Sequence, residues 1–212
     1  MLTKSKTKSA SSRRWLQRQL SDQYVRQARE QGYRSRAAYK LLEIQKKDKI
    51  FQKGHNVVDL GAAPGGWSQV ARECIGQSGK VIALDVLPME SLNGVDIVQG
   101  DFQKEETLDN LVSLLNGEGI NLVISDMAPN LSGITSVDQA RSLNLAEMAL
   151  AFSERVLTNN GILLVKLFQG LGFDAYFAQL KSKFNQVVVR KPKASRAESR
   201  EVYLLAKGYF IG

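Results

Sequence analysis

Four aspartates stand at or near the ends of successive β-branched stretches, and their carboxylates are the first groups in the sequence with a chemical use. They are Asp59, Asp85, Asp101 and Asp126. One such aspartate would carry little meaning, because Asp often begins a turn. The carboxyl ends of parallel strands, however, meet at one edge of a sheet, where ligands bind. Four acids there, without a phosphate-binding lysine, favour a cationic ligand over a phosphorylated one.

A glycine-rich turn, GAAPGGW at 61–67, follows the first of these stretches and leads into a predicted helix. Glycine permits a tight turn and lets a ligand approach the backbone, although a purely structural turn is an alternative. The spacing departs from the dinucleotide fingerprint G-x-G-x-x-G, because Ala63 occupies the third position and Pro64 stiffens the loop. The turn therefore disfavours a pyrophosphate cradle, and with it a nicotinamide oxidoreductase.

Two of the acids fit an adenosine. Asp85 follows Gly66 by 19 residues, at the place of an acid that accepts both ribose hydroxyls. Asp101 ends the next strand, where its carboxylate can face an adenine amino group. S-adenosylmethionine joins an adenosine to sulfonium and ammonium groups, so it is the cofactor that these residues favour.

Lys166 lies inside the apolar stretch ILLVKLF at 162–168. A lysine is costly to bury unless it is paired or functional, although an edge lysine that reaches solvent is an alternative. The preceding predicted strand ends at Asp126, so the amine can approach that carboxylate. The residues leave open whether Lys166 would take a proton as a neutral amine or stabilise developing negative charge as an ammonium.

The elements that must position these side chains are predicted to alternate from Asn56 onward. Strands are predicted at 56–60, 80–86, 96–101, 121–126, 162–168, 186–192 and 200–208, and helices at 66–75, 105–116, 137–158 and 173–183. This alternation predicts a doubly wound α/β fold, with a mostly parallel sheet and helices on both faces. The loop between the last two strands is too short for a crossover helix, so one of them is expected to run antiparallel.

Charge divides the chain into three parts. Residues 1–53 carry 15 Lys and Arg against 4 Asp and Glu, residues 54–180 carry 6 against 15, and residues 181–212 carry 8 against 2. Basic ends around an acidic middle predict contact with a polyanion, the alternative being solvated tails. We therefore separate a basic N-terminal segment, 1–53, from a domain at 54–212. In the segment, 1–12 is predicted to be disordered, and Ser35 is predicted to cap a helix.

Several classes of protein are excluded by composition. No apolar stretch reaches the roughly 20 residues that span a bilayer, and none follows the basic start as in a signal peptide, so a cytoplasmic protein without membrane contact is expected. The single cysteine, Cys74, excludes an internal disulfide. With His55 as the single histidine, a Cys/His zinc cluster is excluded too, and no metal is expected. A monomer is expected.

Seven segments resemble the FtsJ-type family of ribosomal RNA ribose 2′-O-methyltransferases, from about Ser12 to Lys207. They are 14–25, 35–40, 57–70, 99–102, 125–133, 165–170 and 190–208. The resemblance implies a Rossmann-like, S-adenosylmethionine-dependent methyltransferase fold. It also implies methyl transfer to the 2′-hydroxyl of a uridine in large-subunit (23S) ribosomal RNA, with the assembled large subunit as the expected partner.

The same resemblance implies the site residues. It places a Lys-Asp-Lys-Glu catalytic tetrad at Lys40, Asp126, Lys166 and Glu201. The implied cofactor positions are Gly61, Gly65, Trp67, Asp85, Asp101 and Asp126. Taken singly, Lys40 and Glu201 would be interpreted as surface charges. Only the resemblance makes them candidates for catalytic residues. Lys166 is expected to be the principal catalytic group.

The basic flanks are expected to meet RNA phosphates, which would give affinity but little base specificity. The candidates are Arg13, Arg14, Arg18, Arg26, Arg34, Arg36, Arg190, Lys191, Lys193 and Arg196. Tyr24, Tyr33 and Tyr39 are candidates to stack on an unpaired base, with core packing as the alternative use.

Rival functions fit less well. A base methyltransferase acting on DNA would show paired prolines and an aromatic residue after the fourth strand, where this chain has Asp126-Met127-Ala128-Pro129-Asn130. A cytosine C5 enzyme needs a cysteine nucleophile, and Cys74 lies on the helix after the glycine-rich turn. An RNA-binding or ribosome-assembly factor that retains this fold without activity is the non-enzyme alternative, against which the Asp126 and Lys166 pair argues.

Overall fold

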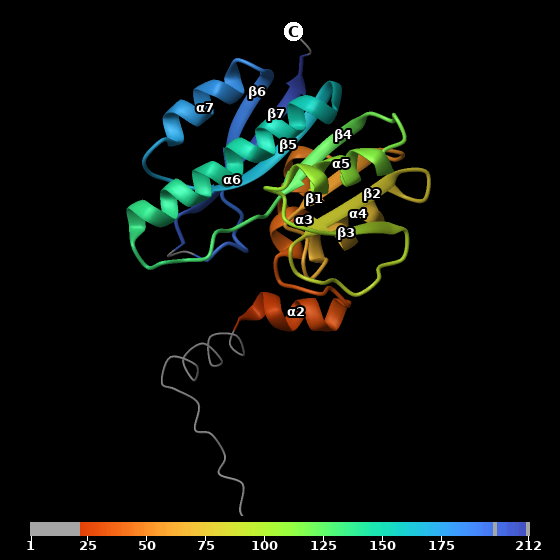
Figure 1. The fold of residues 1–212 in the computed structure, drawn as a ribbon. Helices are drawn as coiled ribbons and strands as arrows, with labels where there is room; N and C mark the ends of the chain where they lie inside the picture. The colour runs from red at the N-terminus through yellow and green to blue at the C-terminus, as the bar shows by residue number, and fades with distance from the viewer. Residues whose placement is uncertain (1–21, 197–198, 211–212) are drawn as a thin grey trace, which may run out of the picture.

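The computed structural model describes residues 22–196 and 199–210 (Figure 1). The predicted disorder of 1–12 and the candidate phosphate contacts Arg13, Arg14 and Arg18 lie outside these residues. The elements in chain order are α2 (Gln23–Gln31), α3 (Ala38–Asp48), β1 (Asn56–Leu60), α4 (Gly66–Ile75), β2 (Lys80–Asp85), β3 (Val95–Gln99), α5 (Glu105–Leu114), β4 (Ile120–Ser125), α6 (Thr135–Val156), β5 (Leu157–Phe168), α7 (Phe173–Lys181), β6 (Phe184–Arg190) and β7 (Glu201–Tyr209).

The strands form one sheet in the order β3-β2-β1-β4-β5-β7-β6. The first five strands pair in parallel, and β7 pairs antiparallel with both β5 and β6. The predicted doubly wound, mostly parallel fold with one antiparallel strand is thereby confirmed. Because β7 runs against β5, the first residues of β7 stand beside the last residues of β5.

Helices cover both faces of the sheet, as predicted (Figure 1). Helices α5, α6 and α7 pack on one face, where their apolar side chains share a core with alternate strand residues such as Val58, Val123 and Leu163. Helices α3 and α4 pack on the other face, against the intervening strand residues such as Val57 and Ile124. Burial on both faces explains why the central strands read as continuous apolar runs rather than as an alternating pattern.

Helix α2 lies beyond the sheet edge at which the parallel strands end (Figure 1). It begins after Asp22, whose carboxylate accepts a hydrogen bond from the Tyr24 amide at 3.0 Å, and it ends at Gly32 with φ of 77°. The predicted start of the next helix was wrong. Helix α3 begins after Ala37 without a side-chain cap, so Ser35 does not cap it. Residues 33–37 instead form an irregular segment against α4.

One strand is longer than its apolar pattern indicated. Strand β5 begins at Leu157, which pairs with Ile120, and the register then shifts so that Leu122 pairs with Ile162. Asn160 has φ of 64°, within this irregular stretch. The polar residues between Leu157 and Ile162 hid this early pairing. None of the described helices combines the length and hydropathy that a bilayer crossing requires.

Candidate active site

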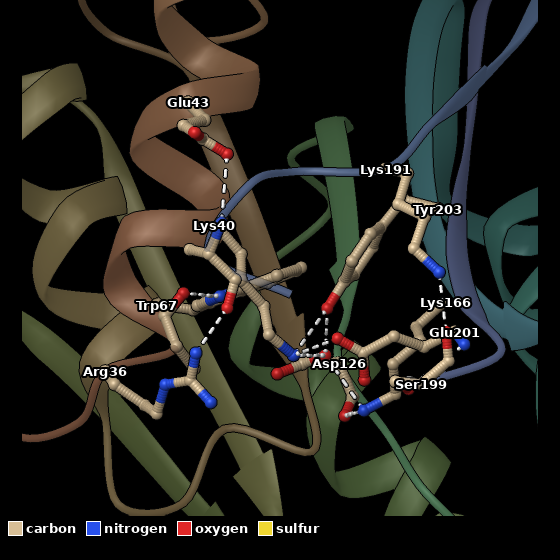
Figure 2. Close-up of polar contacts among 12 residues, drawn as sticks. Arg36, Lys40, Glu43, Trp67, Asp126, Lys166, Lys191, Ser199, Glu201 and Tyr203 are labelled. Atoms are coloured by element: carbon tan, nitrogen blue, oxygen red, sulfur yellow. Dashed lines mark hydrogen bonds and ion pairs between the residues drawn. The ribbon is translucent and has the colours of Figure 1, made fainter. Parts of the chain in front are cut away.

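The structure brings together the four side chains of the expected tetrad at the carboxyl ends of β4 and β5 (Figure 2). Lys166 points from β5 and is only 7% exposed. Its Nζ lies 2.9 Å from Oδ1 of Asp126, and it also donates to the Asp126 backbone carbonyl at 2.5 Å. The neighbouring order of β4 and β5 produces this contact, since Asp126 directly follows β4.

The second lysine reaches the same carboxylate from the opposite side, on α3. Lys40 Nζ lies 2.8 Å from Oε1 of Glu201 and 3.9 Å from Oδ1 of Asp126. Glu201 is the first residue of β7, and it faces the site because β7 enters beside the end of β5. Two ammonium groups and two carboxylates therefore alternate in one largely buried cluster, a balanced arrangement in which each charge has an opposite partner.

Tyr203 is a fifth member of the cluster, which sequence reasoning missed. Its hydroxyl donates to Oδ1 of Asp126 at 2.7 Å and accepts from Lys40 Nζ at 3.0 Å (Figure 2). The signal was available, because residues two apart on a strand share a face, and Tyr203 follows Glu201 by two. The register also places Tyr203 directly opposite Lys166.

The cluster shifts the acidity of its members. Burial alone would raise the pKa of Asp126, but the ammonium groups of Lys166 and Lys40, with hydrogen bonds from Lys166 and Tyr203, hold that pKa below its usual value. Burial would also raise the pKa of Glu201, but the charge of Lys40 and its hydrogen bond outweigh this effect, so the pKa of Glu201 is lowered. Burial, followed by the charges of Asp126 and Glu201, raises the pKa of Tyr203. Both carboxylates are thus anions near neutral pH, and the tyrosine keeps its proton.

The glycine-rich turn lies beside this cluster and is shaped by close packing. Gly61 has φ of 74°, and a Cβ there would lie 2.7 Å from the Met127 side chain and 3.0 Å from its backbone. Gly65 has φ of 111° and immediately precedes α4. Both positions therefore favour glycine for their backbone conformation, and Gly61 also for its close contact with Met127, the residue that follows Asp126.

Two of the predicted cofactor acids stand at strand ends with partly exposed carboxylates. Asp85 ends β2, where Oδ2 accepts from the Ala63 amide at 2.9 Å and Oδ1 accepts from the Leu87 amide at 2.9 Å. Asp101 follows β3 and accepts from the Gln103 amide at 2.9 Å. These bonds orient the carboxylates, and each carboxylate oxygen has a further lone pair that can accept a ligand hydroxyl or amino group.

Two further residues singled out from the sequence, Trp67 and Asp59, are buried. The Trp67 ring is 3% exposed, packs 5.6 Å from the Tyr203 ring and donates from Nε1 to the Ala37 carbonyl at 2.8 Å. Asp59 lies inside β1 rather than at its end and is fully buried. Its Oδ2 accepts from Ser68 at 2.6 Å, while Oδ1 has no partner. Burial, opposed by the Ser68 hydrogen bond and assisted by Asp126 and Asp85, raises the pKa of Asp59 to about 7.

Several of the basic flanking residues bind other parts of the protein. Arg36 pairs with Asp22 at 3.1 Å and donates to the Ala194 carbonyl, which links α2 to the loop before β7. Arg190 makes a bidentate pair with Asp48, at 2.8 and 2.6 Å. Lys191 and Arg34 donate to backbone carbonyls. Arg26, Lys193 and Arg196 are exposed, and their side chains make no hydrogen bond or ion pair with the described residues.

The three candidate stacking tyrosines pack on one another. The ring of Tyr39 lies 5.5 Å from that of Tyr24 and 5.9 Å from that of Tyr33, between centroids. This cluster fastens α2 to α3, which is the packing use considered from the sequence.

Residues 22–196 and 199–210 contain no group of three or more His, Cys, Asp or Glu side chains placed to hold a metal ion. A surface depression of about 580 Å³ lies along α5 among Glu105, Glu106 and Asp109, and it includes none of the strand-end acids.

Comparison with known proteins identifies the family. The family model for FtsJ-like methyltransferases matches residues 33–209, which include the whole sheet and the full cluster. The chain belongs to the FtsJ-like methyltransferase family. The resemblance that the seven segments indicated is thus confirmed, and the protein is a methyltransferase.

Individual relatives agree with the family model over almost the full length. A protein of Alkalilimnicola ehrlichii named ribosomal RNA large subunit methyltransferase E is 57% identical over 198 residues, covering 93% of this chain and 95% of that protein. A protein of the same name from Marinobacter nauticus is 50% identical over 204 residues, covering 96% and 99%.

A solved structure shows the same fold. The structure of a protein from Plasmodium falciparum, described as a ribosomal RNA methyltransferase, matches with a TM-score of 0.75 and 30% identity, covering 84% of this chain and 98% of that one. The predicted Rossmann-like methyltransferase fold is confirmed.

Proposed function

We propose that this methyltransferase transfers a methyl group from S-adenosylmethionine to the ribose 2′-hydroxyl of a uridine in 23S ribosomal RNA. We further propose that it acts in the cytoplasm, as a monomer, on the assembled large subunit. The names of its two relatives support ribosomal RNA as the substrate. The observation that carries the proposal is a nearly buried lysine, Lys166, held by Asp126 beside the glycine-rich turn.

The residues at the sheet edge fit S-adenosylmethionine. Asp85 and Asp101 offer partly exposed carboxylates suited to ribose hydroxyls and an adenine amino group, and Asp126 offers negative charge near a cationic centre. Gly61, Gly65 and the backbone of Trp67 belong to the glycine-rich turn, which we assign to the same cofactor site. When bound there, S-adenosylmethionine supplies an electrophilic methyl group on a positively charged sulfur.

Lys166 is the group that we assign to the acceptor hydroxyl. Asp126 accepts two hydrogen bonds from its Nζ, one through the carboxylate and one through the backbone carbonyl. The remaining position on this nitrogen is available to the 2′-oxygen of a ribose. From that position a neutral amine would take the hydroxyl proton, and an ammonium would stabilise the negative charge that develops on oxygen.

The other members of the cluster hold this geometry. Asp126 fixes the direction of Lys166 and, as an anion, supports positive charge in the site. Lys40 and Glu201 form an ion pair of 2.8 Å that places a second ammonium beside Asp126. We assign Lys40 and Glu201 to orientation of the ribose and of the two lysines, because orientation of the reacting oxygen is itself a large part of catalysis.

We assign RNA binding to the basic segment 1–53 together with the loop before β7, and methyl transfer to the domain at 54–212 with Lys40 contributed from the segment. Arg26, Lys193 and Arg196 have exposed cationic side chains in these two regions, and they suit phosphate contacts. Arg36, Arg190 and Lys191 hold neighbouring parts of the chain together in these regions, because their side chains are already ion-paired or hydrogen-bonded within the protein.

The test is Lys166→Ala in a single-turnover assay with labelled S-adenosylmethionine and large subunits lacking the modification. We expect the rate to fall by about 100-fold or more while the cofactor dissociation constant stays within about twofold of wild type. Lys181→Ala is the matched control, since Lys181 lies in the last turn of α7, over Phe177. A near-normal rate in Lys166→Ala removes the assignment of Lys166.

The substrate is tested with the wild-type protein. We expect label in large subunits, in less amount in naked 23S RNA, and at the 2′-oxygen of one uridine when the ribose is mapped. Tight binding of the particles without any transfer of label would instead support the non-enzymatic assembly factor.

A further inference from the structure

One guanidinium from the N-terminal segment joins two loops of the cofactor site. Arg34 Nη1 donates to the Pro64 carbonyl at 3.2 Å and to the Glu90 carbonyl at 2.8 Å, and Nη2 donates to the Ser91 carbonyl at 2.7 Å. Pro64 belongs to the glycine-rich turn, whereas Glu90 and Ser91 belong to the loop that follows Asp85. Carbonyl groups of these two loops share no other donor side chain among the described residues.

Two adjacent glycines of the turn, Gly65 and Gly66, leave room for residues 34–35 of the N-terminal segment. A Cβ at Gly66 would lie 2.4 Å from Oγ of Ser35, and a Cβ at Gly65 would lie 3.0 Å from Nη1 of Arg34. Real Cβ atoms essentially never approach as closely as the first distance, and the second is tighter than nine in ten real contacts, so residues 34–35 occupy the space that glycine leaves. The Gly-Gly pair therefore has a reason for being glycine that is independent of any ligand.

Further hydrogen bonds fix the segment to α4. The Arg34 amide donates to Oε1 of Gln69 at 2.8 Å, and Nε2 of Gln69 donates to the Gly32 carbonyl at 3.0 Å. Nε1 of Trp67 donates to the Ala37 carbonyl at 2.8 Å. Both ends of the segment are thus anchored to the first turn of α4, which holds the guanidinium over the two loops.

We propose that Arg34 is a positioning residue that clamps the two cofactor loops together, rather than a phosphate contact for RNA. This inference rests on the proposed S-adenosylmethionine site. Asp85 already ties the base of one loop to the other through the Ala63 amide. Arg34 holds the outer side through Glu90 and Ser91, in the same loop in which Val86 and Leu87 are more than half exposed. Without the clamp, the loops are held at one side only, and the bound conformation becomes a smaller fraction of the population.

The experiment compares Arg34→Ala and Arg34→Lys with wild type by calorimetric titration of S-adenosylmethionine, alongside saturation kinetics and RNA affinity. We expect Arg34→Ala to raise the cofactor dissociation constant and KM by about 10-fold, with kcat at saturating cofactor within about twofold. Arg34→Lys should lie between, because an ammonium can replace some of the three hydrogen bonds. RNA affinity should stay unchanged. Arg155→Ala is the control, since this surface arginine pairs with Asp109 on the α5 and α6 side.

The opposite pattern overturns the proposal: unchanged cofactor affinity with weakened RNA binding would make Arg34 a phosphate contact. Absence of cofactor binding by wild type would instead overturn the proposed function. A second pair of variants decides the matter if Arg34→Ala does not fold. Gly66→Ala should weaken cofactor binding, and the added Ser35→Ala, which removes the clashing Oγ, should restore it. Failure of Ser35→Ala to restore binding would mean that Gly66 acts on the ligand directly.

Discussion

Lys166 and Tyr203 are directly paired across β5 and β7, and both hydrogen-bond the same oxygen, Oδ1 of Asp126. The lysine nitrogen lies 2.9 Å from this oxygen and the tyrosine oxygen lies 2.7 Å from it. A donor to a carboxylate favours its charged form, so Tyr203 helps to keep Asp126 anionic beside Lys166.

Tyr203→Phe tests this relationship, because it removes the hydroxyl and keeps the ring that packs on Trp67. We expect the single-turnover rate to fall about 10-fold, and the acidic limb of the pH–rate profile to move to higher pH as the pKa of Asp126 rises. Rates measured between pH 3 and 9 check this, with thermal unfolding as the control for folding. An unchanged rate with an unchanged acidic limb would show that the hydroxyl has no part in the reaction.

The ion pair of Lys40 and Glu201 should be strongly coupled, because both side chains are largely buried. We expect Lys40→Met to lower the free energy of unfolding by about 3 kcal/mol, since it leaves a buried carboxylate without its ammonium partner. The double variant Lys40→Met with Glu201→Gln should recover part of this loss. Urea unfolding at pH 7 measures the free energies of unfolding of wild type, the two single variants and the double variant. Simple additivity of the Lys40→Met and Glu201→Gln effects would contradict the coupling.

Asp59 should make stability depend on pH in the direction opposite to an ordinary ion-paired acid. Its pKa is about 7 in the folded protein, against an ordinary value of 3.8 for an aspartate. Between these values the folded state holds a proton that the unfolded state has released, so the favourable contribution is complete below pH 3.8 and is lost as pH rises through 7. The loss amounts to at most about 4 kcal/mol, at 1.36 kcal/mol per unit.

Asp59→Asn removes this titration while keeping an acceptor for Ser68. We therefore expect the variant to gain in unfolding temperature relative to wild type as pH rises from 5 to 8. Asp96→Asn, at an exposed position of β3, is the matched control. A difference between Asp59→Asn and wild type that does not change with pH would show that Asp59 does not carry this proton.

The basic side chains should separate into two groups by their response to salt. Arg26→Ala should reduce the slope of log Kd for RNA against log salt by about 0.7 to 0.9, as expected for one lost phosphate contact. Arg190→Ala should leave the slope unchanged and lower stability, because its guanidinium is already bound to Asp48. Filter binding between 50 and 300 mM salt distinguishes the two, and equal slopes for Arg26→Ala and wild type would contradict the assignment of Arg26.

The strand-end acids could be predicted from the sequence because they depend on local pattern alone. The β-branched runs predicted the ends of these strands to within two residues, since β3 ends at Gln99, and the parallel sheet brought Asp85, Asp101 and Asp126 to one edge. Lys166 followed from the same reasoning, since a lysine in an apolar run next to that edge needs a partner. For Lys40 and Glu201, local pattern was not enough, and the family resemblance named them.

The remaining contacts depend on tertiary packing between distant residues. Tyr203 meets Lys40 across 163 positions of the sequence, and Arg34 meets Ser91 across 57. The basic segment around Arg34 suggested phosphate binding. The sequence near Arg34 gives no sign that the carbonyls of three distant residues lie within reach of its guanidinium. Ser35 was predicted as a cap for a similar reason, whereas its side chain fills the space beside Gly66.

The place of β7 between β5 and β6 has a consequence for biosynthesis. Glu201 and Tyr203 belong to β7, which follows the other six strands of this sheet in the sequence, and β6 pairs with no strand but β7 among the described residues. A growing polypeptide that has already completed β1 through β5 therefore lacks two of the five side chains of the cluster. Only when the last strand leaves the translating ribosome does the protein acquire its complete catalytic centre.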